Sequence, residues 1–263
     1  MDILQSIILG LIQGITEWLP ISSTGHLRIA EHFFGLSVPL LFDVLLHVAT
    51  LFVILVYFRG AIKNVFSALW KRDFHSQDGK LILPIIIGTI PTALIALLVG
   101  NELDAYFNTL FLLGAGLIAG GIILFTSKFT TEKKDAISYP VAFLIGVMQG
   151  ISIIPSISRS GLTIAVALLL GIKREVAFKF SFLLSVPAII GALGLTLIQE
   201  HNALAIAGIG TLEIVASLAI TVAVSFVALK VLWKSLAANK FYLFSIYCLI
   251  IGAALVALGL LGF

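Results

Sequence analysis

The residues that could do chemistry gather in one stretch near the N-terminus, between Gln13 and His26. This stretch reads QGITEWLPISSTGH and holds an amide, a carboxylate, three consecutive hydroxyls and an imidazole. The sequence around it is otherwise strongly apolar. Together these groups could bind a phosphorylated headgroup, hold a cation and transfer a proton.

Glu17 is the strongest candidate in this stretch. A carboxylate at membrane depth costs about 2.5–3.5 kcal/mol on insertion scales, so it needs a basic partner, a metal ion or a water-filled cavity. Gln13 lies one helical turn earlier and on the same helix face. The pair could present two oxygens to a hard cation such as Mg²⁺ or Ca²⁺. An ion pair between Glu17 and an arginine is the purely structural alternative.

Three hydroxyls and an imidazole follow the carboxylate at the predicted start of a helix: Ser22, Ser23, Thr24 and His26. Helix N-capping explains one hydroxyl but does not require three. The helix N-terminus adds free backbone N–H groups and a positive dipole end, which suit a phosphate. His26 is either a buried structural histidine or, beside these groups, a general acid/base or phosphoryl acceptor.

A second copy of the same skeleton occurs in the other half of the chain and reads QGISIIPSISRSG. The Gln-Gly pair precedes the closing glycine by the same interval in both copies, from Gln13 to Gly25 and from Gln149 to Gly161. Two polar segments broken by proline and glycine, at corresponding places in two hydrophobic halves, indicate a site at the midplane of a membrane protein.

Arg159 is the central residue of the second copy. Its planar fork of five donors stays protonated and matches phosphate oxygens. Ser158, Ser160 and Thr163 add hydroxyl donors on either side of it. Arg159 could instead only neutralise Glu17, and the two roles are compatible in one site.

Asp43 and His47 form a further polar pair, four residues apart and therefore on one helix face. A supporting or structural role is as good an interpretation of this pair as direct chemistry.

The composition shows what kind of protein positions these groups. Of the 263 residues, 60% are hydrophobic and 11% are charged, and the mean hydropathy is +1.17. Soluble domains carry about a quarter charged residues, so the chain is predicted to be an all-α polytopic membrane protein. The net charge of +3 is explained by loop lysines and arginines, and no nucleic-acid partner is expected. The single Cys248 excludes an internal disulfide.

Ten apolar segments divide into two kinds. Six are long enough to cross a bilayer, and we predict these crossings at residues 39–58, 81–99, 109–126, 175–197, 205–229 and 241–262. Four are too short or too polar to cross alone, and we predict half-helices at residues 3–19, 24–35, 139–153 and 161–171. Each pair of half-helices would form a re-entrant hairpin. Residues 59–80 are expected to form a loop.

The two halves are expected to form an inverted-topology repeat within one membrane domain, residues 1–263. Residues 127–138 are the best boundary, with repeat one at about 1–127 and repeat two at about 138–263. Each half holds three crossings and one hairpin, and an odd number of crossings turns the second half upside down. The two hairpin tips should therefore enter from opposite faces and meet.

The positive charges predict the orientation. Of 16 Lys and Arg residues, 14 fall on the face opposite the N-terminus, and the loops on the other face have none. The base-rich face is therefore predicted to be cytoplasmic, with both termini outside. These bases are Arg59, Lys63, Lys71, Arg72, Lys80, Lys128, Lys133, Lys134, Lys173, Arg174, Lys179, Lys230, Lys234 and Lys240.

The sequence resembles the undecaprenyl-diphosphate phosphatase family, also called the bacitracin-resistance family, over its whole length. Two motifs carry the resemblance: Gln13-x-x-x-Glu17 continuing to Ser22-Ser-Thr-Gly-His26, and Pro155-x-x-Ser158-Arg159-Ser160-x-x-Thr163. The family's first acidic position accepts Glu or Gln, and Gln13 cannot act as a base. The second motif usually has Gly after its proline, where this chain has Ser156.

The resemblance implies a plasma-membrane hydrolase that converts undecaprenyl diphosphate to the monophosphate and recycles the lipid carrier for peptidoglycan and cell-wall synthesis. It also implies a divalent cation, a site reached from the outer face and bacitracin resistance. By position, Gln13 and Glu17 fall on the acidic motif and would hold the cation, Ser23 and His26 fall on its hydroxyl-imidazole end, and Arg159 falls on the phosphate-binding arginine.

We expect Ser23 to be the nucleophile, with Glu17 or His26 taking its proton, while a His26 phosphoenzyme and direct attack by water stay open. Ser22, Thr24, Ser158, Ser160 and Thr163 are expected to bind substrate. The rival hypothesis is a flippase for the lipid carrier, because inverted repeats with broken helices are transporter architecture. The expected partners are the polyprenyl diphosphate, membrane lipids and, as one option, a second copy in a homodimer.

Overall fold

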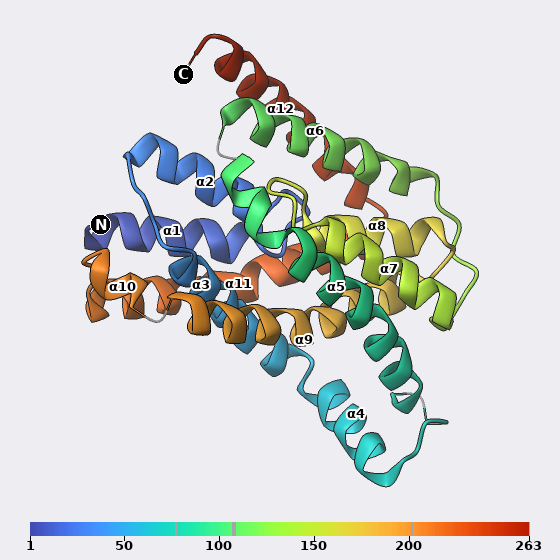
Figure 1. The fold of residues 1–263 in the computed structure, drawn as a ribbon. Helices are drawn as coiled ribbons and strands as arrows, with labels where there is room; N and C mark the ends of the chain where they lie inside the picture. Colours follow the sequence, from blue (N-terminus) through green and yellow to red (C-terminus); the bar gives the residue numbers. More distant parts are fainter. Residues whose placement is uncertain (77, 107–108, 201, 263) are drawn as a thin grey trace.

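The computed structural model describes residues 1–76, 78–106, 109–200 and 202–262, without the side chains of 100–106 and 205, and the chain is almost entirely helical (Figure 1). The α-helices are α1 (Ile3–Thr16), α2 (Ser23–Phe34), α3 (Leu40–Tyr57), α4 (Arg59–Lys71), α5 (Ile82–Tyr106), α6 (Leu110–Thr126), α7 (Tyr139–Ile151), α8 (Arg159–Leu169), α9 (Arg174–Glu200), α10 (Ala203–Ile206), α11 (Thr211–Ala237) and α12 (Phe244–Leu260). Short 3-10 turns, η1 (Gly79–Leu81), η2 (Ser127–Phe129) and η3 (Phe241–Leu243), adjoin three of them.

Within the described residues, six helices are long and apolar enough to cross a membrane. They span Leu40–Tyr57, Gly79–Val99, Leu110–Phe129, Arg174–Glu200, Thr211–Ala237 and Phe241–Leu260. The prediction of an all-α polytopic membrane protein with six crossings is therefore confirmed.

The fifth crossing was placed too early in the chain. It was predicted at 205–229, whereas α11 runs from Thr211 to Ala237. Gly208, at φ +64°, and Gly210, the N-cap, delay its start. Leu232 and Leu236 are fully buried, so packing continues the helix beyond the apolar run that the sequence suggested.

The prediction of a loop at 59–80 was also wrong in part, because α4 occupies its first half. Apolar residues recur at helical spacing there, at Ile62, Phe66 and Leu69, but lysines interrupt them. A short amphipathic helix of this kind gives no continuous apolar run.

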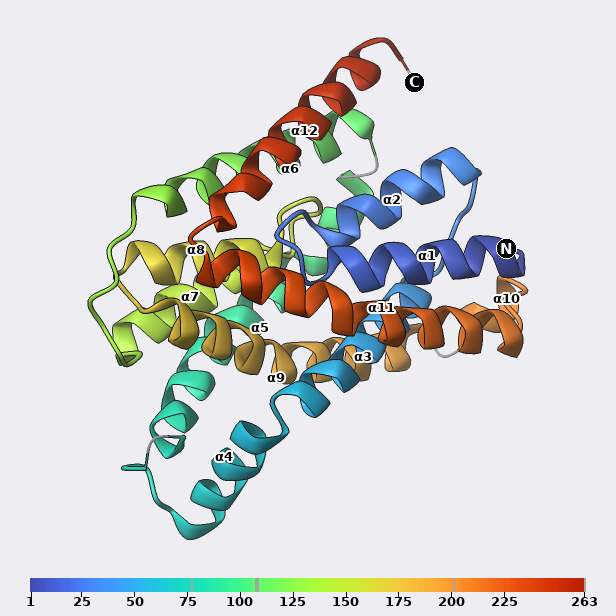
Figure 2. The same cartoon turned by 180° about the vertical axis from the view of Figure 1, so that it is seen from behind.

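The four short helices form two hairpins whose tips lie in the middle of the molecule. Figures 1 and 2 show α1 running inward from the end that carries the N-terminus, and α7 running inward from the opposite end. The connections after these helices, residues 17–22 and 152–158, lie near each other at the centre in both views. This arrangement places the polar stretches of both halves deep inside the protein.

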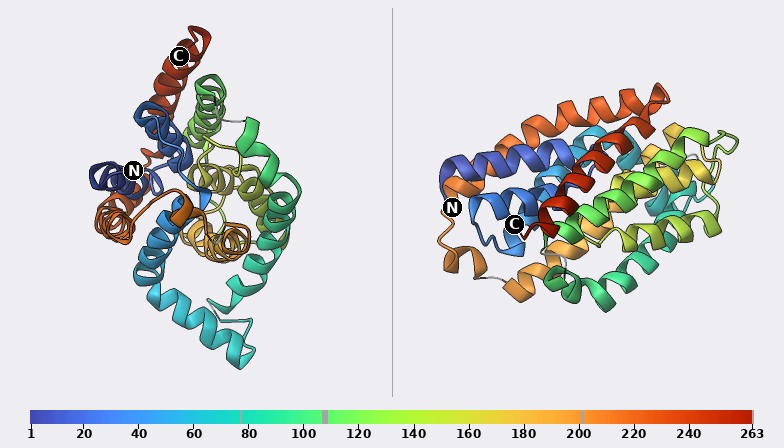
Figure 3. Two further views of the ribbon diagram at one scale, coloured as in Figure 1. Left: turned by 60° about the vertical axis from the view of Figure 1, so that its left-hand side comes forward. Right: turned by 90° about the horizontal axis from the view of Figure 1, so that it is seen from above.

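Each hairpin's first helix packs on a long helix from the other half. The Thr221 hydroxyl of α11 donates to the Gly10 carbonyl of α1 at 2.9 Å, and the Thr92 hydroxyl of α5 donates to the Gly146 carbonyl of α7 at 2.8 Å. Glycines let such helix backbones approach closely. The helices α6 and α12, green and red in Figure 3, also pack closely. A Cβ added to Gly114 would lie 2.6 Å from the Gly252 carbonyl oxygen.

The two tips pack directly against each other. A Cβ added to Gly25 would lie 2.7 Å from Ser156 Oγ, and one added to Gly161 would lie 3.0 Å from Pro20 Cβ. Aligned on the shared interval, Gly25 corresponds to Gly161 and Pro20 to Ser156. The same glycine-to-tip contact therefore occurs twice.

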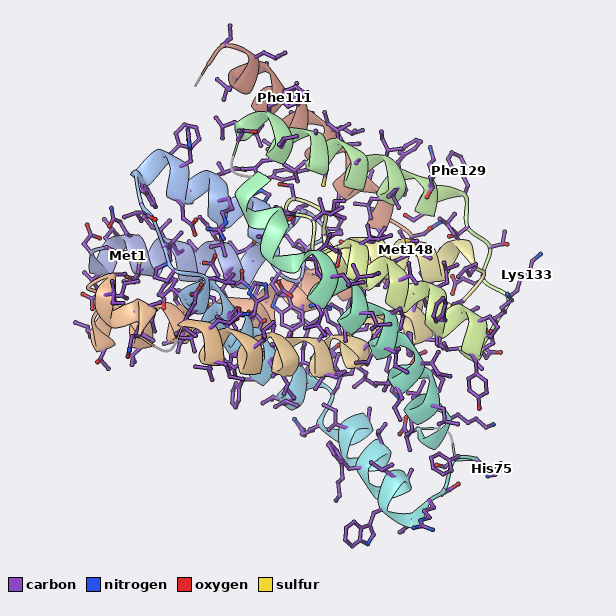
Figure 4. The ribbon with its side chains drawn as sticks, viewed as in Figure 1. Met1, His75, Phe111, Phe129, Lys133 and Met148 are labelled. Atoms are coloured by element: carbon purple, nitrogen blue, oxygen red, sulfur yellow. The ribbon has the colours of Figure 1, made fainter. Side chains whose placement is uncertain are left out.

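The base-rich end of the molecule and the end that carries the N-terminus lie opposite each other. Figure 4 shows Met1 at one end, and Lys133 and His75 toward the other. The N- and C-termini lie on the same side in Figure 1. The orientation of these ends in a cell membrane stays a prediction.

Candidate functional site

Glu17 is the centre of the site formed where the tips meet. It is the C-cap residue of α1, and 8% of it is exposed. Arg159 Nη2 donates to Glu17 Oε1 at 2.6 Å, and Ser23 Oγ donates to Glu17 Oε2 at 2.8 Å. Because Arg159 belongs to the second hairpin, this cluster joins the two halves of the chain.

Corresponding N-caps place the two partners of Glu17. Ser22 Oγ accepts a hydrogen bond from the Gly25 N–H at 3.2 Å, which starts α2 and makes Ser23 its first residue. Ser158 Oγ accepts one from the Gly161 N–H at 3.1 Å, which starts α8 and makes Arg159 its first residue. Side chains of this type are strongly preferred at N-caps because they satisfy free N–H groups.

One hydrogen-bond donor of the Arg159 guanidinium is unused among the described residues. Its Nη1 is buried and has no hydrogen-bond partner within the described part of the chain. The guanidinium lies over the Phe182 ring, with 5.5 Å between Cζ and the ring centroid. Beside a helix N-terminus, such a donor suits an anionic oxygen.

His47 of α3 contacts the carboxylate as well. His47 Nε2 lies 3.4 Å from Glu17 Oε2, and Nδ1 lies 2.9 Å from the Asp43 carbonyl oxygen. Both ring nitrogens face acceptors, an arrangement that a doubly protonated imidazole satisfies. Glu17 thus lies between a guanidinium and an imidazole. The sequence indicated His47 only through its spacing from Asp43, which left its role open.

Asp43 and Arg28 extend this polar cluster. Arg28 Nη1 lies 2.9 Å from Glu31 Oε2, and Arg28 Nη2 lies 3.6 Å from Asp43 Oδ2. Both carboxylates are buried. The Arg28–Asp43 ion pair therefore joins α2 to α3, the helix that carries His47.

His26 is held elsewhere. Its Nδ1 lies 2.7 Å from the Ser22 carbonyl oxygen and its Nε2 lies 2.8 Å from the Tyr247 hydroxyl. The imidazole stacks on Tyr247 of α12, with 5.7 Å between ring centroids. The hydrogen bonds among the described residues do not connect His26 with Glu17, Ser23 or Arg159.

Two of the other hydroxyls expected to bind substrate, those of Ser160 and Thr163, have hydrogen-bond partners within the protein. Ser160 Oγ donates to the Trp18 carbonyl at 3.4 Å. Thr163 Oγ1 donates to the Arg159 carbonyl at 2.8 Å and lies 2.6 Å from Ser181 Oγ. Thr24 is half-buried in the first turn of α2.

One protein oxygen beside Glu17 is unused. Gln13 Nε2 donates to Glu17 Oε2 at 3.4 Å, while Gln13 Oε1 is buried without a hydrogen-bond partner among the described residues. The described residues contain no group of three or more His, Cys, Asp or Glu that could hold a metal ion. This donor set fits a cation that shares its coordination with substrate phosphates, which is common for Mg²⁺.

An aromatic cluster closes the site toward the base-rich end. Phe182 lies beneath Arg159 and packs on Trp18 at 5.1 Å between ring centroids. It also packs on Phe178 at 5.0 Å and Phe58 at 6.2 Å. These rings place apolar side chains between the polar cluster and the base-rich end, where Arg59 follows α3 and Arg174 starts α9.

Comparison with known proteins gives matches over nearly the whole chain. The family model described as bacitracin resistance protein BacA matches residues 6–254. A protein named undecaprenyl-diphosphatase from Desulforapulum autotrophicum is 40% identical over 273 residues, covering 96% of each chain. Proteins of the same name from Carboxydothermus hydrogenoformans and Korarchaeum cryptofilum are 40% and 36% identical, with at least 98% of each chain covered.

Proposed function

The chain belongs to the bacitracin resistance protein BacA family, and on that basis we propose that it hydrolyses undecaprenyl diphosphate in the membrane. The products are undecaprenyl phosphate and inorganic phosphate, so the reaction returns the lipid carrier to cell-wall polymer synthesis. One observation carries the assignment to a site: Glu17 contacts Ser23 at 2.8 Å and Arg159 at 2.6 Å where the hairpin tips meet.

Ser23 is the proposed nucleophile. Its hydroxyl already donates to Glu17 Oε2, so Glu17 can take the proton as Ser23 Oγ forms a bond to the terminal phosphorus. The bond from that phosphorus to the bridging oxygen breaks, and undecaprenyl phosphate leaves. Water then hydrolyses the phosphoserine and releases inorganic phosphate.

His26 and water are the rival nucleophiles. The contacts of His26 with Ser22 and Tyr247 occupy both its ring nitrogens, which supports Ser23 over His26. Protein denatured at neutral pH, after reaction with a diphosphate labelled on its terminal phosphorus, would carry acid-stable phosphoserine in the first case and acid-labile phosphohistidine in the second. Direct attack by water would leave no label on the protein.

Arg159 is proposed to bind the non-bridging oxygens together with the N–H groups at the starts of α2 and α8. Its unused Nη1 supports this role. Arg159→Lys should lose most activity, about 10²-fold, because a point charge cannot replace the planar fork. Near-normal turnover by Arg159→Lys would remove Arg159 from the site.

We retain a divalent cation, Mg²⁺ or Ca²⁺, in the proposal. Gln13 Oε1 and Glu17 would hold it together with substrate phosphates, which the unused Gln13 oxygen supports. Such an ion neutralises charge on the diphosphate oxygens. The activity should then fall when a chelator is added, whereas a chelator-insensitive rate would contradict the assignment.

The proposed topology is an inverted repeat with two re-entrant hairpins, the site opening to the outer face of the plasma membrane and both termini outside. Two observations support it. Helices α1 and α7 each pack on a long helix of the other half, and the lysines and arginines gather on one side of the sequence-derived topology. In a Cys248→Ala background, a cysteine replacing Asp2 should react with an impermeant maleimide on intact cells, and one replacing Lys133 should not. The reverse pattern would contradict the orientation.

The direct test of function is hydrolysis of undecaprenyl diphosphate by purified protein in detergent. Wild type should release phosphate and Glu17→Ala should not. The flippase alternative predicts no phosphate release by either protein. Light scattering measures the molar mass of the same purified sample and decides whether the protein forms the proposed homodimer.

A further inference from the structure

Helix α4 is held at the boundary of the apolar bundle by membrane-spanning helices at both ends. It starts at Arg59, and the buried residue Phe58 connects it directly to the end of α3. The next span begins at Gly79. A helix of 13 residues is about 20 Å long, so α4 cannot move far from this surface. Figures 1 and 2 show it projecting from the rest of the bundle.

One face of α4 is apolar and uncovered. Phe66, Leu69 and Trp70 are 67%, 48% and 91% exposed. Residues three and four positions apart lie on the same side of a helix, so these side chains form one patch. Within the described chain they have no covering element.

The opposite side of α4 is fixed to the following loop. Asn64 Nδ2 donates to Asp78 Oδ2 at 2.8 Å, and Lys179 Nζ of α9 donates to Asp78 Oδ1 at 2.5 Å. Burial alone would raise the pKa of Asp78, but the hydrogen bonds from Lys179 and Asn64 hold it below its usual value. An ionised Asp78 therefore fixes which face of α4 turns outward.

The charges around the apolar patch are mainly positive. Arg59, Lys63, Lys71 and Arg72 lie on α4 or at its C-cap, and all four are exposed. The nearby carboxylates are engaged: Asp78 as above, and Asp73 Oδ1 by the N–H groups of residues 75 and 76, at 3.0 and 3.1 Å.

We propose that α4 is an interfacial helix that inserts Phe66, Leu69 and Trp70 into the leaflet at the base-rich end and binds anionic phospholipid headgroups through its basic residues. An apolar face flanked by lysine and arginine, with a tryptophan at its edge, is typical of helices that lie in the membrane interface. A second copy of this chain would meet the same four bases as like charges, so charge complementarity favours the anionic lipid surface.

The test is quenching of tryptophan fluorescence by phospholipids brominated near the top of their acyl chains. Trp18 is fully buried and Trp233 is half-buried, so the loss of quenching in Trp70→Phe reports α4. In phosphatidylcholine vesicles, we expect wild type to be quenched strongly and Trp70→Phe only weakly. Equal quenching of both proteins would show that Trp70 does not enter the bilayer. This result would contradict the proposal, whether water or a second copy covers the patch.

Headgroup preference is tested with the same readout. Brominated phosphatidylglycerol at a small, fixed mole fraction should quench Trp70 several-fold more than brominated phosphatidylcholine, since each base near the surface enriches anionic lipid about fivefold. The Lys63→Gln/Lys71→Gln pair should lose this excess. The matched pair Lys133→Gln/Lys134→Gln, in the linker between the halves, should keep it. If both pairs keep the excess, the bases of α4 do not bind the headgroups.

Discussion

The hairpin of α1 and α2 and the hairpin of α7 and α8 start from the same sequence skeleton and contribute different chemistry. At corresponding positions the first has Glu17 and Ser23, and the second has Ile153 and Arg159. Both hairpins have a serine N-cap, Ser22 in one and Ser158 in the other, and both have a glycine where the tips pack together. The shared residues build the geometry, and the residues that differ supply an acid and hydroxyl on one side and a base on the other.

The two glutamines show the same division. Gln13 Nε2 faces Glu17, whereas Gln149 Nε2 donates to the Thr92 hydroxyl and the Leu184 carbonyl, both at 3.3 Å. Gln149 therefore ties α7 to α5 and α9. A buried glutamine supports the fold in one hairpin and adjoins the proposed catalytic carboxylate in the other.

The tips also bend at different places. Ser22 has φ +71° in the first hairpin, and Ser156 has φ +70° in the second, at positions that do not correspond. Ser22 uses its hydroxyl as a cap, while Ser156 Oγ is buried without a hydrogen-bond partner among the described residues. The second tip therefore carries backbone strain without the compensation present in the first.

The largest difference between the hairpins should come from the carboxylate. Glu17→Gln should lower kcat about 10³-fold, because the proposed acceptor of the Ser23 proton is removed. Ile153→Val, at the corresponding position of the second hairpin, should change kcat less than about twofold. Phosphate release by the two purified variants checks this, and similar losses in both would mean that the effect of Glu17→Gln is structural.

The first hairpin should also depend on His47, since only it has a buried carboxylate to hold. His47→Leu removes a donor to Glu17 Oε2, and a hydrogen bond to a charged group is worth about 1.5–3 kcal/mol, so kcat should fall about 10- to 100-fold. His47→Gln keeps a donor and should retain most of the rate. If kcat and KM of both variants match wild type, the contact does not matter for the reaction.

The contact between the tips should be intolerant of added volume. An alanine at Gly25 would place its Cβ 3.1 Å from Ser156 Cα as well as against Ser156 Oγ, and overpacking typically costs about 1–3 kcal/mol. Gly25→Ala should lower both the midpoint of thermal unfolding and the activity. Gly191→Ala on α9, where a Cβ has no neighbour within 4 Å, is the control. Equal behaviour of the two variants would mean that the tips are not tightly packed.

The smallest expected effect is a gain in stability at the second tip. Ser156→Gly removes a left-handed non-glycine residue, a conformation that costs roughly 1–2 kcal/mol, together with a buried hydroxyl. The midpoint of thermal unfolding should rise. Ser158→Gly, where φ is −68° and the hydroxyl caps α8, should not stabilise. A decrease with Ser156→Gly would show that the hydroxyl has a stabilising partner.

The sequence predicted five of the six crossings and the four short helices to within a few residues, because long apolar runs and Pro/Gly breaks are local signals. It also predicted that the tips meet, and the structure places Glu17 and Arg159 in contact. It could not show that His26 is held by Tyr247, or that His47 reaches Glu17, because both contacts depend on how distant helices cross. Helix α4 was missed because its lysines interrupt every apolar window.

The central claim is that Glu17 and Arg159 act in one shared site, and a double-mutant cycle on kcat tests it most directly. Glu17→Gln and Arg159→Lys alone should cost about 10³-fold and about 10²-fold. Residues that act as a unit are strongly non-additive, so the double variant should be little slower than Glu17→Gln. A loss equal to the product of the single losses, about 10⁵-fold, would mean that the two residues act independently and would contradict the account.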